Sequence, residues 1–217
     1  MRLPSPDPGD VAAALLAVLA RHENCVPHLH LPLQAGSDEI LRRMNRQYDL
    51  AAFDDMIARV HAVLDRPAIS TDIIVGFPGE TDACFAETLA TARRSGFCKI
   101  HAFPFSPRPG TAAARWQKDY VHHQKIKDRM QALARLGGEL SERFERQFAG
   151  ETTRVIVEAD RGRGRRAVDG LRHGRSDRYF EVYFDAPQAQ PGAVLDVRLT
   201  RRSPQRMHGE LVAPPAG

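Results

Sequence analysis

The sequence has few cysteines, and their spacing does not suit metal binding. Cys25, Cys84 and Cys98 are the only three in 217 residues. Neither a CxxC nor a CxxxCxxC spacing occurs, so the sequence offers no local cysteine site for a metal ion or cluster. An odd, sparse count also provides no disulfide framework, which favours a reducing compartment. We therefore expect a cytoplasmic protein.

Long apolar runs are also missing. No stretch approaches the roughly 20 residues that a helix needs to cross a bilayer. The most apolar run, 11–20, follows Asp7 and Asp10, where a secretory signal would carry positive charge. We expect an amphipathic helix there, capped by Asp10 and ending near Arg21, and no membrane partner.

Charge of one sign does not dominate the composition. The net charge is +4 and the pI is about 9.2, a mild preference for polyanionic partners. Apolar residues make up 42% and charged residues 27%, which is ordinary for a globular protein. The length suits one large domain, or a medium domain followed by a small one.

Three strand–turn–helix units are expected between residues 26 and 147. Their strands fall at 26–34, 68–76 and 97–105, and alternation with helices favours parallel pairing. Each strand has one apolar and one polar face, which favours a barrel wall over a sheet with two apolar faces. Three units cannot close such a barrel, so we predict a partial (β/α) barrel in residues 1–149.

Beyond residue 150 the helical periodicity stops. Short runs at 152–159, 179–185 and 194–200 predict strands of a small all-β barrel in residues 150–217. A cationic loop is expected within it, suited to RNA phosphates or simply solvated. Its seven arginines are Arg161, Arg163, Arg165, Arg166, Arg172, Arg175 and Arg178.

The turns after the three α/β strands predict a binding site, because ligands of parallel α/β folds bind at the carboxyl ends of strands. Asp72 and Glu80 suit acid–base chemistry, and capping of loops or positioning of a ligand explains them equally well. His28 and His30 share a strand face, but no third ligand stands out by spacing. We therefore expect a hydrogen-bonded histidine pair and predict no metal site.

Three sequence blocks around these turns resemble radical S-adenosylmethionine (SAM) methylthiotransferases. The blocks are HLHLPLQAGSD at 28–38, STDIIVGFPGET at 70–81 and KIHAFPFSPRPGT at 99–111. They resemble the fourth, fifth and sixth barrel strands of that family, and the final segment resembles its RNA-binding TRAM domain. The third block is most similar to the branch that modifies N6-threonylcarbamoyladenosine in tRNA.

The resemblance implies an enzyme that adds a methylthio group at C2 of that adenosine, with SAM and 4Fe–4S clusters as cofactors and tRNA as partner. It places Gln34 and Ser37 beside the ribose and methionine of SAM, and Phe103 and Phe105 near its adenine. The full set of cofactor-binding residues that we predict is Gln34, Ser37, Asp72, Gly76, Glu80, Phe103 and Phe105.

The sequence departs from this family at the cysteines. The family holds its radical cluster with a CxxxCxxC motif, which does not occur here, and its auxiliary cluster with three further cysteines. We predict that the chain alone is inactive and assign it no catalytic residue. Three hypotheses remain. The chain is one part of the transferase, either alone or with the N-terminal half supplied as a separate chain; it is a non-catalytic RNA-binding protein; or it is an unrelated α/β enzyme using His28, His30 and Asp72.

Overall fold

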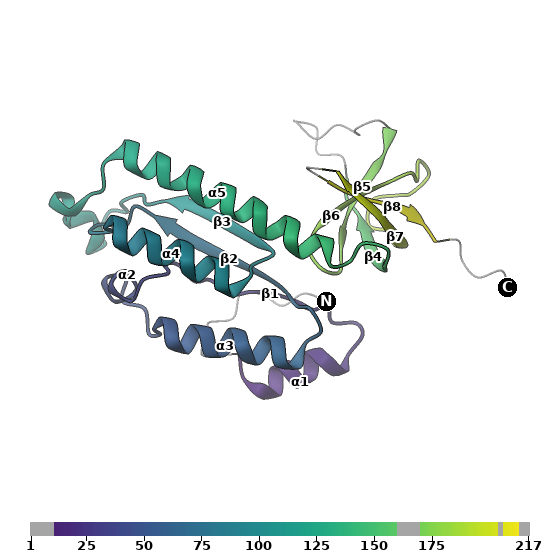
Figure 1. Ribbon diagram of the computed structural model, residues 1–217, viewed down its shortest axis with the longest axis horizontal. Coiled ribbons are helices and arrows are strands. Elements are labelled where there is room, and N and C mark those ends of the chain that lie inside the picture. The colour runs from purple at the N-terminus through teal and green to yellow at the C-terminus, as the bar shows by residue number, and fades with distance from the viewer. Residues whose placement is uncertain (1–10, 160–169, 204–205, 213–217) are drawn as a thin grey trace. The chain divides into compact units, whose positions relative to one another are not determined.

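The computed structural model describes residues 11–159, 170–203 and 206–212, without the side chains of 201 and 202. The chain forms two compact units, Met1–Ser141 and Glu142–Gly217 (Figure 1). Within the described residues, no helix has both the length and the apolar character that a bilayer crossing requires.

The first unit contains a three-stranded parallel sheet in the order β1-β2-β3. Its strands are β1 (His28–His30), β2 (Ala68–Val75) and β3 (Lys99–Pro104). The parallel pairing confirms the prediction from strand–helix alternation. β1 is shorter than expected, because prolines at 27 and 32 have no N–H to donate to a ladder.

Five α-helices accompany this sheet: α1 (Ala13–Arg21), α2 (Asp38–Arg43), α3 (Leu50–Val63), α4 (Asp82–Ser95) and α5 (His123–Arg146). α1 ends at Arg21 as predicted. Its N-cap residue is Ala12, however, so the prediction that Asp10 caps this helix was wrong.

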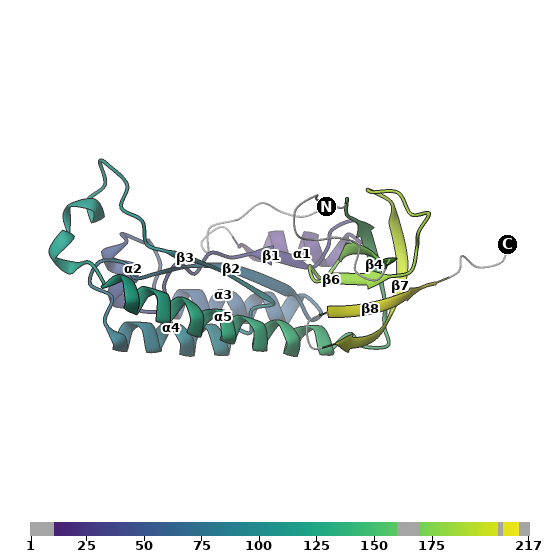
Figure 2. The same ribbon diagram turned by 90° about the horizontal axis from the view of Figure 1, so that it is seen from above.

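The hydrophobic core lies between one face of the sheet and the helices. Figures 1 and 2 show α3, α4 and α5 on the same side of the three strands. Leu29, Leu31 and Ile73 are fully buried on this face and pack with Phe53 of α3 and Leu133 of α5. The opposite face is polar and partly exposed, which is the asymmetry that the sequence predicts. Whether the sheet belongs to a larger barrel stays a prediction.

The second unit is a closed five-stranded barrel in the order β4-β5-β6-β8-β7. The strands are β4 (Thr152–Val157), β5 (Arg172–Ser176), β6 (Glu181–Phe184), β7 (Val194–Ser203) and β8 (Arg206–Leu211). All pairs are antiparallel except β6 with β8. β4, β6 and β7 match predicted strands, whereas β5 and β8 were not foreseen.

Candidate cofactor site

Three turns meet at the carboxyl edge of the sheet, as parallel pairing requires. The first turn is at 34–38, the second at 75–80 and the third at 105–111. The backbone N–H of Phe105 donates to the carbonyl of Val75 at 2.8 Å, and the ring of Phe105 lies 5.3 Å from that of Phe77. The first turn is tied to α4, because the N–H of Gly36 donates to the hydroxyl of Thr88 at 3.1 Å. The turns are therefore fixed to one another and to the helix behind them.

Glu80 closes the second turn from inside the protein. Its carboxylate accepts a hydrogen bond from the N–H of Gly76 at 2.8 Å and one from Arg129 at 2.6 Å. The two side chains are only 1% and 5% exposed. Burial raises the pKa of the Glu80 carboxyl, and the hydrogen bond from Gly76 and the charge of Arg129 oppose that rise. This geometry matches the loop-capping alternative for Glu80.

The segment after β3 is held against the second turn by Arg43 of α2. The Arg43 guanidinium pairs with Asp119 at 2.5 Å and lies 5.1 Å from the centre of the Trp116 ring. The N–H of Gly79 donates to the carbonyl of Asp119 at 2.8 Å. Sequence reasoning missed Arg43, Asp119 and Arg129, because no local pattern marks partners more than 40 residues apart.

The seven predicted cofactor-binding residues divide into two groups by exposure. Ser37, Gly76 and Glu80 are buried. Gln34, Asp72 and Phe105 are partly exposed, and Phe103 is 50% exposed. Gln34 also adopts a φ of 63°, a left-handed conformation that residues other than glycine rarely adopt. The second group has surface to offer to a ligand, although a binding role for all seven stays a prediction.

A hydrogen-bonded network occupies the polar face of the sheet. The hydroxyl of Ser70 lies 3.0 Å from Nε2 of His28 and 3.0 Å from Nδ1 of His30, and Nε2 of His30 lies 3.3 Å from Asp72. Burial lowers the pKa of the neighbouring His101, while Asp72 opposes the change. The histidines thus form the hydrogen-bonded pair that we expected.

This Ser–His–Asp order is not a nucleophilic triad. Ser70 is fully buried, so its hydroxyl cannot reach a substrate. Among the described residues, no group of three metal-ligand atoms forms around His28, His30 or Asp72. The network therefore gives no support to the hypothesis of an unrelated enzyme built on these three residues.

The expectation that the chain lacks the cysteine ligands of an iron–sulfur cluster stays a prediction, and the structure describes the surroundings of its three cysteines. Cys84 and Cys98 are buried, Cys25 is partly exposed, and all three are free thiols. The Sγ of Cys84 donates to Glu39 at 3.4 Å. Within the described residues, none of the three is grouped with two other metal-ligating side chains.

Of the seven arginines predicted to bind RNA, the structure describes three. Arg161, Arg163, Arg165 and Arg166 lie outside the described residues. Of the others, Arg172 donates to the carbonyl of Pro187 at 3.2 Å, and the guanidinium of Arg178 lies 5.2 Å from the ring of Phe148. Arg175 pairs with Glu158 at 3.3 Å. These three guanidinium groups are partly exposed and already have contacts within the barrel unit.

Both the sequence and the fold have counterparts among known proteins. Residues 4–92 match the family profile described as the Radical SAM superfamily. The chain also superposes on coproporphyrinogen III oxidase (HemN) from Escherichia coli, described as a radical SAM enzyme. The TM-score is 0.52 at 17% sequence identity, covering 91% of this chain and 46% of the oxidase, and this likeness concerns the fold alone.

The sequence is also similar to proteins that are named for a modification of tRNA. The chain is 39% identical, over 94% of its length, to the tRNA-2-methylthio-N(6)-dimethylallyladenosine synthase of Acidothermus cellulolyticus. It is 34% identical, over 98% of its length, to the synthase of the same name from Bacillus pumilus. It spans 41% of the length of each of these relatives. The chain is thus similar in sequence to synthases of this name over less than half of their length.

Proposed function

We propose that this chain is part of a radical SAM enzyme that adds a methylthio group at C2 of an N6-modified adenosine in tRNA. The observation that carries the proposal is 39% identity, extending over 94% of the chain, to a synthase named for that product. The similarity thus includes both the α/β unit and the barrel.

In this proposal the four predicted cofactor-binding residues that are not buried, Gln34, Asp72, Phe103 and Phe105, contact SAM. Gln34 and Asp72 offer an amide and a carboxylate for the ribose and amino groups of the cofactor. Phe103 and Phe105 provide aromatic surface for its adenine. The buried Gly76 and Glu80 act indirectly, because their hydrogen bond fixes the shape of the second turn. SAM supplies the methyl group and, when reduced by a cluster, the radical.

In this proposal the 4Fe–4S clusters are held by cysteines outside this chain, because its three cysteines are far apart in the sequence and form no CxxxCxxC motif. We therefore expect that the isolated chain does not cleave SAM. Incubating the purified chain with SAM and a strong reductant tests this expectation, with 5′-deoxyadenosine measured by mass spectrometry. Formation of that product at enzymatic rates would contradict it.

The names of the relatives point to N6-dimethylallyladenosine as the substrate, so we propose this nucleoside first. The resemblance of the block at 99–111 keeps N6-threonylcarbamoyladenosine as the second candidate. Replacing the matching region of a bacterial methylthiotransferase with this chain tests the choice, in a host that lacks both tRNA modifications. Mass spectrometry of digested tRNA would then show which 2-methylthio nucleoside returns.

A non-catalytic RNA-binding protein is the alternative function, and the closed barrel with its arginines is the observation that favours it. In this alternative the barrel is a TRAM domain and contacts tRNA. An antibody against the barrel would measure the size of the native product in the source cells. A band well above 24.2 kDa would support part of a complete enzyme, whereas a band at 24.2 kDa would favour RNA binding, or complementation by a second chain.

A further inference from the structure

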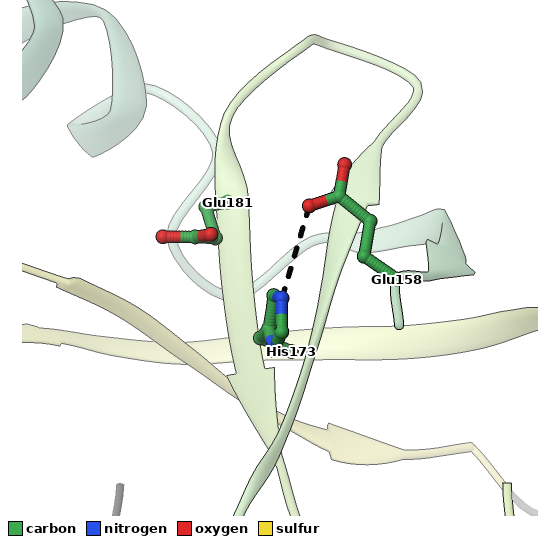
Figure 3. Close-up of side chains that lie close together, drawn as sticks. All are labelled: Glu158, His173 and Glu181. Carbon is green, nitrogen blue, oxygen red and sulfur yellow. Dashed lines mark ion pairs between the residues drawn. The ribbon is translucent and has the colours of Figure 1, made fainter. Parts of the chain in front are cut away.

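Three side chains of types that bind metal ions meet on the barrel of the second unit. They are Glu158, which follows β4, His173 of β5 and Glu181 of β6. Each offers a ligand atom that lies within 4.8 Å of the other two. Figure 3 shows the two glutamates on either side of His173, and Nε2 of His173 lies 3.9 Å from the carboxylate of Glu158.

Strand pairing explains why these residues converge. The N–H of Glu158 donates to the carbonyl of His173 at 3.1 Å, so the two residues lie opposite each other. Glu181 pairs with Arg175, two residues beyond His173 on the same strand. Because side chains alternate with a period of two, all of these residues share one face of the barrel wall. The sequence could not show the cluster, since its members are 15 and 8 residues apart.

One imidazole nitrogen and two carboxylates are donors that suit zinc. A tetrahedral zinc ion with ligands at about 2.0–2.2 Å requires separations of about 3.3–3.6 Å between donor atoms. The separation between His173 and Glu158 exceeds that by only a few tenths of an ångström. Rotation of the glutamate side chains can close the remaining distance, because both side chains are only partly buried.

The surroundings of the cluster orient two of the ligands. The side chain of His173 is buried, at 7% exposed, and the hydroxyl of Tyr183 donates to Glu181 at 2.9 Å. Outer partners of this kind fix ligand geometry in metal sites. Arg175 is the competitor, because its guanidinium contacts both oxygens of Glu158. Those contacts are long, at 3.3 and 3.5 Å, so a metal ion can displace them at modest cost.

We propose that Glu158, His173 and Glu181 bind one divalent transition-metal ion, with zinc as the preferred ion. The ion would join β4, β5 and β6 of the barrel wall and would offset two carboxylates on that face. This site does not depend on the proposed function, because zinc binding and methylthio transfer are measured separately.

The test uses the full chain, stripped of metal with a chelator and titrated with zinc by calorimetry. We expect one zinc ion per chain and a rise in the thermal midpoint of the barrel, because binding to the folded state alone stabilises it. His173→Gln and Glu158→Gln should each weaken binding at least tenfold. Arg175→Gln should tighten it, because the competing cation is removed.

His208→Gln is the matched control, since its ring lies 6.2 Å from that of Tyr183 and it contributes no ligand. It should bind zinc as the unmodified chain does. Cobalt substitution provides a second readout, because the visible spectrum of bound cobalt reports nitrogen and oxygen ligands even in a destabilised variant. The proposal is overturned if stoichiometric zinc is not bound, or if binding persists unchanged in both Glu158→Gln and His173→Gln.

Discussion

Replacing Arg129 by methionine should be among the most damaging single changes in the α/β unit. Methionine keeps much of the side-chain volume but removes the guanidinium that pairs with Glu80 at 2.6 Å. The carboxylate would then stay buried, with the N–H of Gly76 as its one remaining partner among the contacts described above. Breaking a buried ion pair from one side typically costs about 3–5 kcal/mol.

Urea unfolding of the full chain measures this effect. Trp116 is the only tryptophan and lies in the α/β unit, so its fluorescence follows that unit. With a urea dependence of about 2 kcal/mol per molar, a loss of about 4 kcal/mol lowers the midpoint by about 2 M. Removing the carboxylate as well, in Glu80→Gln with Arg129→Met, should recover a large part of the loss.

Acid should also reduce the difference between the variant and the unmodified chain. Burial raises the pKa of Glu80, and removing Arg129 raises it further, since the arginine opposes that rise. A carboxyl whose folded pKa lies above its unfolded value contributes stability at low pH and loses it as the pH rises through the folded pKa. The variant should therefore be least stable, relative to the original, at neutral pH.

Arg94→Met is the matched control for this experiment. Arg94 pairs with Asp54 at 2.9 Å, but the two side chains are 44% and 40% exposed. Exposed pairs contribute about 0–1 kcal/mol, so the midpoint should hardly move. If Arg129→Met shifts the midpoint no more than Arg94→Met does, the argument from the buried pair is refuted.

Two further predictions concern packing and protonation. Gly36→Ala should lower the free energy of unfolding by about 1–3 kcal/mol in the same urea assay, because the added Cβ would lie 2.5 Å from the Cα of Thr88. Gly138→Ala, a control with open space around it in α5, should raise that free energy by up to about 1 kcal/mol, and equal effects of the two would refute the packing argument. His101→Gln should make the chain less sensitive to acid, measured as urea midpoints across a pH series. Burial lowers the pKa of His101 below its ordinary value of 6.5. Its neutral imidazole therefore contributes to the free energy of unfolding above that pH, and this contribution is lost as the pH falls through the folded pKa. The charges of Asp72, His30 and Lys99 also act on this pKa in the folded state. An unchanged pH dependence in this variant would contradict a lowered pKa of His101 in the folded state.

Much of the α/β unit could be predicted from the sequence because its signals are local. The alternation of Leu29, Leu31 and Leu33 with polar residues fixes which face is buried. Glycine and proline mark the turns after the strands, and parallel pairing then brings those turns to one edge. The partners that hold the turns, such as Arg129 for Glu80, could not be predicted, because side chains 49 residues apart meet only through the tertiary fold.

The barrel shows where local signals fail. β5 has the sequence RHGRS, which has neither β-branched residues nor an apolar alternation. It is a strand because its neighbours impose the pairing and because Gly174 lets the strand approach β4 closely; a Cβ there would lie 2.5 Å from the carbonyl oxygen of Ile156. The same residues explain why the metal-ligating cluster around His173 was not anticipated.

The strand order β1-β2-β3 also affects how this chain behaves in concentrated solution. Only β2 has a hydrogen-bonded neighbour on each side; within the part of the chain that the structure describes, the outer edges of β1 and β3 have no strand partner. Backbone groups along such an edge must bond to water or to another strand. Each edge is thus a template on which a strand from a second molecule can add, so self-association should increase with protein concentration unless a further strand occupies it.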